Sequence, residues 1–326
     1  MLPIKTLTVV TVILLLIVGA LTRFSLANDS LREIKVDISE SKVVIESLNK
    51  TATYEDRLKV EFDAGSTWIN LEYDTVLEGN ETMAKVKVEL FDLIEFVDVN
   101  ANGTYDSNIP QEFVKKIGLD ELKPETLLYE NISENDILGV RINAVLTAPS
   151  KYPNLSFRLT LHLFGDFVLY QGVPLEPTVM KLDIGINNFP FSNETSKLAL
   201  HSKVTIVAED KLEEKTEGAV AGKVGKWTVF FSWSNTSDVD GSLAPVESTI
   251  VELKSVREPG KFDFVNELYL SYEQGNQILH DPRMGVGTLH FALFTPFPWT
   301  ILYGVIVIVA IGVIALILVK RKVKRD

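Results

Sequence analysis

Apolar and polar residues alternate along most of the chain. Between residues 157 and 163 every second residue is apolar, and the residues between them are Arg158, Thr160 and His162. A period of two places the two sets on opposite faces of a β-strand. On this pattern strands are also predicted at 34–38, 42–48, 58–62, 67–73, 84–91, 139–146, 167–170, 182–186, 198–207, 227–233, 248–256 and 262–270.

About a dozen such segments separated by turn residues predict an all-β fold, an antiparallel β-sandwich. One short helix is predicted from Pro110 to Ile117, because proline favours the first helical turn and Gly118 follows at a favoured stop position. The helix lies in a polar interval, residues 100–136. This interval either divides two smaller sandwiches or is an excursion from one extended two-sheet unit, and we favour the single unit.

The N-terminal segment has the order of a secretory signal peptide. A single base, Lys5, precedes an uncharged stretch from Thr6 to Thr22, and small residues lead to a predicted cleavage after Ala27. The apolar stretch of about 17 residues is short of the roughly 20 that span a bilayer. An uncleaved signal anchor is the alternative, and residues 1–27 are predicted to be a leader.

The C-terminal segment is predicted to be a transmembrane helix over residues 298–319. Its Ile-, Val- and Leu-rich sequence has no charge and is long enough to cross about 30 Å of hydrocarbon. Trp299 and Tyr303 stand where an interfacial aromatic belt belongs. Lys320, Arg321 and Lys322 open a basic tail, residues 320–326, which places this end in the cytoplasm by the positive-inside rule. Residues 28–297 are then an ectodomain of a type I, single-pass protein at the cell membrane.

Charge, cysteine content and glycosylation sequons describe the compartment. The net charge is −12, and because both predicted ends are basic the ectodomain alone carries −18, which argues against a nucleic-acid partner. The chain has no cysteine. Eight N-x-S/T sequons occur where about two are expected by chance, and their asparagines are Asn28, Asn49, Asn80, Asn102, Asn131, Asn154, Asn193 and Asn235. Many sequons without cysteine, between a leader and a basic-flanked anchor, resemble the layout of archaeal cell-surface glycoproteins.

One segment, residues 98–106, resembles the calcium loops of EF-hand and dockerin-like modules. The resemblance implies Ca²⁺ ligands at Asp98, Asn100, Asn102, Asp106 and the Thr104 carbonyl, with Gly103 at the tight turn. Position 12 of the motif is Ile109 instead of an acid, so Glu112 would have to substitute and binding would be weak. The alternative is an Asn/Gly turn whose side chains bond their own backbone. Glycosylation of Asn102 would also exclude it as a ligand.

The remaining candidate chemistry is sparse. His162, His201, His280 and His290 suit proton transfer, but H-E-x-x-H, G-x-S-x-G and phosphate-loop motifs are all missing from the sequence. Trp68, Trp227 and Trp233 could stack on sugars, although an alternating apolar stripe favours core packing. The acidic turn from Asp238 to Gly241 is too short for an ion site. No catalytic residue is assigned.

We therefore expect a surface glycoprotein for adhesion, envelope structure or ligand binding, with a glycan or another surface protein as partner, and not an enzyme. The alternative is a membrane-tethered polysaccharide-active enzyme. A concave sheet that brings Asp183 and His162 or His201 together would favour the enzyme.

Overall fold

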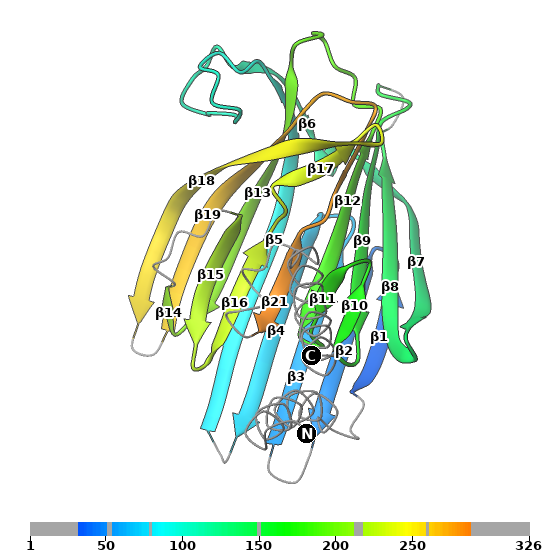
Figure 1. The fold of residues 1–326 in the computed structure, drawn as a ribbon, viewed down its shortest axis with the longest axis vertical. Coiled ribbons are helices and arrows are strands. Elements are labelled where there is room, and N and C mark those ends of the chain that lie inside the picture. Colours follow the sequence, from blue (N-terminus) through cyan, green and yellow to red (C-terminus); the bar gives the residue numbers. More distant parts are fainter. Residues whose placement is uncertain are drawn as a thin grey trace, which may run out of the picture.

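The computed structural model describes residues 32–50, 54–77, 80–148, 151–211, 218–258 and 261–287 (Figure 1). Nearly all of them lie in antiparallel β-strands, and the only helical element in these ranges is a single turn of 3-10 helix, Leu119–Glu121. The all-β prediction is confirmed. No helix in the described part of the chain is long and apolar enough to cross a bilayer. The predicted leader and the 298–319 segment lie outside these ranges.

All but two of the strands form two sheets. Sheet A contains β1 (Glu33–Ser39), β2 (Lys42–Lys50), β3 (Tyr54–Asp63), β4 (Trp68–Leu77), β5 (Asn80–Phe96), β6 (Phe113–Gly118), β13 (Lys197–Ala208), β19 (Lys261–Tyr272) and most of β18 (Ser242–Glu258). Sheet B contains β7 (Lys123–Glu134), β8 (Ile137–Thr147), β9 (Ser156–Phe164), β12 (Val179–Asn187), β20 (Gln277–His280), β21 (Arg283–Gly287), β17 (Thr236–Val239), β16 (Trp227–Ser232), β15 (Ala219–Val224) and β14 (Asp210–Lys211).

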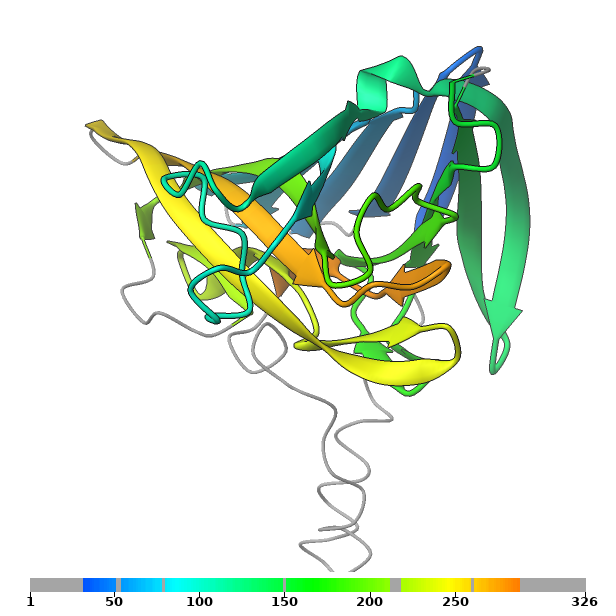
Figure 2. The same ribbon diagram turned by 90° about the horizontal axis from the view of Figure 1, so that it is seen from above.

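One strand belongs to both sheets. The first four residues of β18 pair with β17 in sheet B, and the residues from Val246 onward pair with β19 in sheet A. Figure 2 shows β18 as the long yellow ribbon that runs from β17 across to the edge of sheet A. The two sheets are therefore continuous through a single backbone.

The main core lies between the sheets and draws on the alternating apolar positions of both. Val43 and Ile45 of β2 and Leu159 and Leu161 of β9 belong to one buried cluster. The period of two sends the residues between them to the outer faces of the sandwich. Those outward residues carry the chemistry described below.

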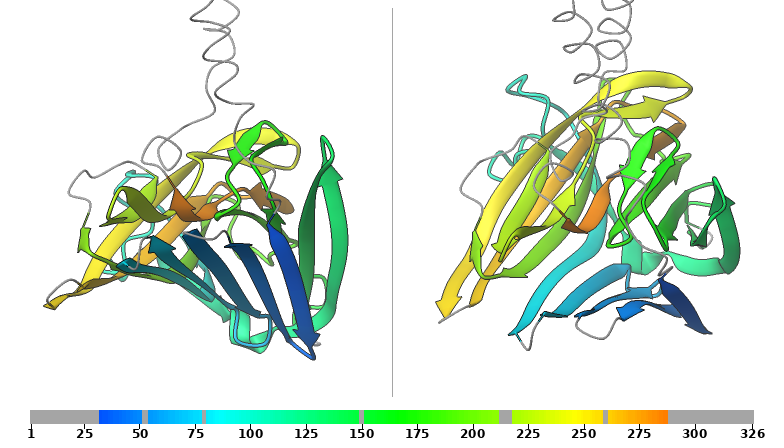
Figure 3. Two further views of the ribbon diagram at one scale, coloured as in Figure 1. Left: turned by 90° about the horizontal axis from the view of Figure 1, so that it is seen from below. Right: turned by 60° about the horizontal axis from the view of Figure 1, so that its bottom comes forward.

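A hairpin covers part of the outer face of sheet B. It consists of β10 (Val168–Tyr170) and β11 (Val173–Leu175), and its apolar side chains pack on Phe164, Val179 and Phe230 in a second buried cluster. The hairpin lies in front of β9 and β12 in Figure 1 and is seen from other directions in green in Figure 3. Its Tyr170 also packs on the ring of His162, a buried polar residue of β9.

The predicted helix at Pro110–Ile117 is wrong. Residues 110–112 form a turn, and Phe113–Gly118 is strand β6, which pairs with the C-terminal half of β5. β4 pairs only with the first half of β5, so the second half offers free backbone groups that β6 satisfies. Lys115 then reaches the buried carboxylate of Glu95, with 3.1 Å between Nζ and Oε2. Tertiary pairing overrides the local stop and start signals.

Candidate functional site: a polar hollow on the outer face of sheet B

The outer faces of the two sheets differ in how their charges are arranged. On sheet A a row of directly paired residues crosses five strands with alternating charge, and its members are Lys35, Glu46, Lys59, Glu72 and Lys85. Opposite charges on neighbouring strands stabilise a sheet. This face has the pattern of a solvated surface.

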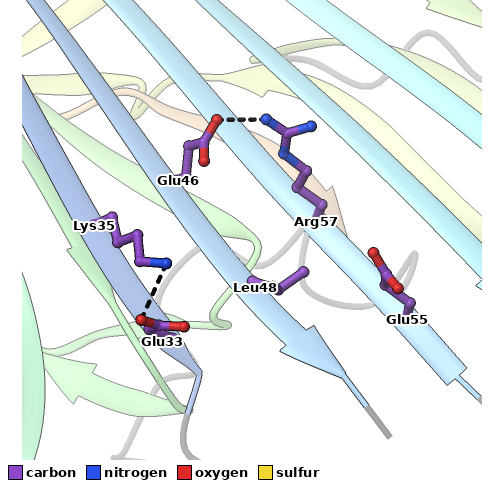
Figure 4. Close-up of a pocket in the computed structure, with 6 residues that line it drawn as sticks. All are labelled: Glu33, Lys35, Glu46, Leu48, Glu55 and Arg57. Atoms are coloured by element: carbon purple, nitrogen blue, oxygen red, sulfur yellow. Dashed lines mark hydrogen bonds and ion pairs between the residues drawn. The ribbon is translucent and has the colours of Figure 1, made fainter. Parts of the chain in front are cut away.

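A hollow of about 240 Å³ lies on this face of sheet A, and Figure 4 shows the residues that line it. Arg57 pairs with Glu46, and Lys35 Nζ lies 3.2 Å from Glu33 Oε1. These side chains are all substantially exposed, and such exposed pairs contribute at most about 1 kcal/mol each. The hollow is a shallow groove between satisfied ion pairs.

A second hollow, of about 260 Å³, lies on the outer face of sheet B. Its lining is entirely polar: Glu130, Arg141, Asn143, Arg158, Thr160, His162, Gln171 and Asp183. These residues come from β7, β8, β9 and β12 and from the turn of the β10–β11 hairpin. Buried ionisable groups adjoin this hollow, whereas the hollow on sheet A has none, so we take the hollow on sheet B as the candidate site.

Strand register places four basic residues side by side beneath the hollow. Arg141 of β8, His162 of β9, Lys181 of β12 and Arg283 of β21 are directly paired neighbours. Directly paired side chains of like charge, here Lys181 and Arg283, destabilise a sheet. Three carboxylates offset them, because Arg141 pairs with Glu130 and Lys181 pairs with both Asp183 and Asp281.

His162 is held between Asp183 and the hairpin. Its Nε2 lies 2.8 Å from Asp183 Oδ2, and its ring packs on Tyr170 with the centroids 5.0 Å apart. The residue is 2% exposed, and within the described ranges its Nδ1 has no hydrogen-bond partner. The carboxylate fixes a proton on Nε2 and leaves the Nδ1 lone pair unpaired.

Lys181 is buried between two acids whose pKa values move apart. Lys181 is 1% exposed. Its Nζ lies 3.2 Å from Asp281 Oδ2 and also contacts Asp183. Burial favours a raised pKa for Asp183, but the hydrogen bond from His162 and the charge of Lys181 outweigh burial and lower it. Burial raises the pKa of Asp281, and repulsion from Asp183 adds to this against the attraction of Lys181. One carboxylate is kept ionised while the other holds its proton more readily.

Asn143, Thr160 and Arg158 complete the wall. Thr160 Oγ1 lies 3.1 Å from Asn143 Oδ1, so these two groups orient each other. Arg158 of β9 is directly opposite Gly185 of β12, and a Cβ added to Gly185 would stand 3.3 Å from Arg158 Nε. Glycine in a strand interior marks such a close approach. The wall therefore presents amide, hydroxyl and guanidinium groups on rigid strands.

The predicted histidines are divided among three environments. His162 and Asp183 meet, as the enzyme alternative requires, but His201 lies on the outer face of sheet A beside Asp92 (3.2 Å) and stacked on Tyr269. His280 is buried with its Nδ1 3.0 Å from the Tyr272 hydroxyl, and burial lowers its pKa to about 4. His290 lies outside the described residues.

The 98–106 segment forms a compact turn. Asp98 Oδ1 accepts from the Asn102 amide at 3.0 Å and Asp98 Oδ2 from the Gly103 amide at 2.9 Å, with Gly103 at a φ of 82° that suits glycine. Asn102 Oδ1 accepts from the Thr104 amide at 2.8 Å. Among the described residues no three acidic or histidine side chains converge as a metal cluster would require. The calcium assignment stays a prediction.

Glu112, the substitute calcium ligand, is fully buried. Its Oε2 accepts from the Asp106 amide at 2.8 Å, and in the described part of the chain its Oε1 has no hydrogen-bond partner. In the second acidic turn, Asp238 Oδ1 accepts from the Gly241 amide at 2.7 Å. That turn has a structural use that needs no ion.

The tryptophans belong to the sandwich. Trp233 is buried in the main core, and the partly buried Trp227 packs against this core. Trp68 is half-buried, with the Lys87 ammonium 5.4 Å from the centre of its ring. None of the three lines the polar hollow.

The sequon asparagines that the structure describes are accessible. Asn102, Asn131, Asn154, Asn193 and Asn235 are exposed, and Asn49 is half-exposed. The side chains of Asn28 and Asn80 are outside the described set. Attachment of a glycan at the six others needs no rearrangement of the core.

Sequence patterns alone could not identify most of the site. Lys181, Arg141 and Arg158 occupy outward positions of alternating strands, exactly as solvated bases do in sheet A. Only the tertiary structure shows that Lys181 is buried and that Asp281 adjoins it. The single available signal was the alternation of His162 and of Asp183 with apolar residues, each in its own predicted strand.

Comparison with known proteins gives little further guidance. No protein family and no curated protein matches the sequence. Among solved structures, a chain described as a kojibiose phosphorylase from the human microbiome matches with a TM-score of 0.21 and 8% identity, over 79% of this chain. This chain spans 33% of that protein. A similarity of this size carries no argument about fold or function.

Proposed function

We propose that the protein is a type I surface glycoprotein whose ectodomain binds a saccharide in the hollow on the outer face of sheet B. The observation that carries this proposal is the all-polar lining of the hollow, which includes the buried His162 and the half-buried Asp183 and adjoins the buried Lys181. Amide, hydroxyl and charged groups fixed on strands can hydrogen-bond sugar hydroxyls without reorganisation. Capture of a saccharide suits adhesion or envelope assembly.

The surface location rests on the leader, the C-terminal apolar segment with its basic tail, and the sequons. The exposed sequon asparagines support glycosylation. Mass spectrometry of native protein should find glycans on several of the eight asparagines. Bare asparagines throughout would remove this argument for the compartment.

A glycan array probed with full-length protein in detergent tests the binding proposal. Thr160→Val should weaken every saccharide interaction, because it removes a hydroxyl from the hollow without changing side-chain volume much. Thr205→Val is the matched control, since Thr205 is a half-buried outward threonine on β13 of sheet A. Equal binding by both variants and the unaltered protein would refute the site, and an array without any bound saccharide would refute the function.

A polysaccharide-active enzyme is the second candidate, and the divergent pKa values of Asp183 and Asp281 favour it. Asp281, which also hydrogen-bonds Asp183, would hold the proton as general acid and Asp183 would act as base, the two roles that glycoside hydrolysis assigns to a pair of carboxyl groups. Release of reducing ends from polysaccharide, lost in both Asp281→Asn and Asp183→Asn, would establish it. Binding without any cleavage by the unaltered protein would leave the binding function alone.

Calcium binding by the 98–106 loop is a further proposal. Asp98 and the buried Glu112 supply carboxylates near the turn, and oxygen ligands of this kind suit Ca²⁺. Asp98→Ala should lower the melting temperature in calcium and leave it nearly unchanged in chelator. Identical melting of the unaltered protein with and without calcium would exclude the ion.

A further inference from the structure

We infer that the ligand of the hollow carries a carboxylate and that Arg158 binds it, so the ligand class is a uronate-containing, acidic saccharide. This inference rests on the proposed saccharide-binding function and narrows its ligand. It comes from the position of Arg158, from its pairing state and from the charge balance of the wall.

The absence of a side chain at Gly185 leaves space for the side chain of Arg158. Arg158 and Gly185 are directly opposed on β9 and β12, and a Cβ at residue 185 would stand 3.3 Å from Arg158 Nε and 3.4 Å from Arg158 Cβ. The Leu279 side chain lies within 3.4 Å of the same point. The missing side chain at residue 185 therefore lets the Arg158 stem lie on the sheet, which reduces the number of rotamers the guanidinium has to lose on binding.

Arg158 differs from three other arginines in the described part of the chain by its pairing. Arg32 pairs with Asp56, Arg57 with Glu46 and Arg141 with Glu130. Arg158 is half-buried and has no ion pair with any residue that the structure describes. A planar guanidinium with five donors matches a carboxylate in a bidentate geometry.

The charges around the hollow leave this one guanidinium uncompensated. Glu130 is taken by Arg141, and Asp183 is taken by His162 and Lys181. The wall thus offers one positive charge on an ectodomain of strongly negative net charge. An anionic group on the ligand would pair with Arg158 and neutralise its charge. Asn143, Thr160 and Gln171 are then available to hydrogen-bond the neutral hydroxyls of the ligand.

Calorimetric titration of full-length protein in detergent with oligogalacturonate and with neutral galactose oligosaccharides of equal length tests the inference. The acidic oligosaccharide should bind at least about tenfold more tightly, because charge-assisted hydrogen bonds contribute about 1.5–3 kcal/mol. Arg158→Met should reduce acidic binding by about ten- to hundredfold and reduce neutral binding much less, so that the preference for the acidic oligosaccharide is lost. Arg57→Met is the control, an exposed arginine on the outer face of sheet A.

Each other outcome overturns the inference in a distinguishable way. Equal affinity for both oligosaccharides removes the carboxylate and leaves saccharide binding in place. An equal loss in Arg158→Met and Arg57→Met shows general electrostatic attraction instead of a site. Failure of both oligosaccharides to bind removes the carboxylate ligand, and the glycan array then decides whether any saccharide binds.

Discussion

Replacing Lys181 by methionine should destabilise the ectodomain far more than the same change at a surface lysine. Lys181 is 1% exposed, contacts Asp183, and lies 3.2 Å from Asp281. At that distance the attraction of one pair is about 5 kcal/mol at an effective dielectric constant of 20. Much of this offsets the desolvation of the lysine, and methionine fills nearly the same volume. The cost of the change therefore comes from the carboxylates left without a cation.

Removing one partner of a buried ion pair costs about 3–5 kcal/mol. The side chains of Asp183 and Asp281 are 31% and 53% exposed, so water can solvate part of their charge and the lower end, about 3 kcal/mol, is expected. A domain of this size loses about 2–4 °C in melting temperature per kcal/mol, which gives a decrease of about 6–12 °C. Lys85→Met is the control, because its pair with Glu72 is half-exposed and contributes at most about 1 kcal/mol.

Thermal melting of full-length protein in detergent at pH 7, followed by tryptophan fluorescence, measures both changes. The double variant Lys181→Met with Asp183→Asn should recover part of the loss, since it removes a stranded carboxylate. Two results would refute the reasoning. One is a melting temperature for Lys181→Met equal to that of Lys85→Met, and the other is a double variant that melts lower than the single one.

Three further predictions concern His280, Gly185 and Phe164. Burial lowers the pKa of His280 to about 4, below its ordinary 6.5, so the stability that depends on its neutral form should be complete above about pH 6.5 and be lost as pH falls toward 4. In urea unfolding at each pH, His280→Phe should lose less unfolding free energy over that range than the unaltered protein. An equal dependence of unfolding free energy on pH in the two proteins would contradict this. Gly185→Ala should displace Arg158 and weaken oligogalacturonate binding severalfold with little change in melting temperature; unaltered binding would show that Arg158 does not depend on that space. Phe164→Ala should destabilise the hairpin and cost about 3–5 kcal/mol in unfolding free energy, and a cost below 1 kcal/mol would show that the hairpin is not anchored there.

Most of the strands that alternation predicted have one face in the core. An exception is 248–256, which lies in the edge part of β18 and is half-buried or exposed throughout. Residues 157–163 and 198–207 fall inside β9 and β13, where buried and half-buried positions alternate over 156–161 and over 200–208. β7 escaped prediction because it is an edge strand with mostly exposed residues and no apolar period. β6 was taken for a helix because Pro110 and Gly118 are local signals, while its pairing with β5 is a long-range one.

The candidate site was visible in the sequence only as residue types. His162 and Asp183 alternate with apolar residues in two predicted strands, and the structure pairs these strands and brings the two side chains to 2.8 Å. Lys181 gave no sign of burial, because a lysine at an outward position has the same sequence pattern whether water or a hairpin covers it. His201 has the same outward pattern as His162 but lies on the other sheet.

The sequence by itself determined the all-β class and which residues face the core, because a period of two is a property of each strand alone. The tertiary structure decided which strands are neighbours, and with them the row of Arg141, His162, Lys181 and Arg283. It also decided that the β10–β11 hairpin covers part of the outer face of sheet B, while the outer face of β1 to β4 in sheet A stays exposed around its hollow. Register and coverage depend on contacts between residues far apart in the chain, and those contacts set the burial and the pKa values from which a function is inferred.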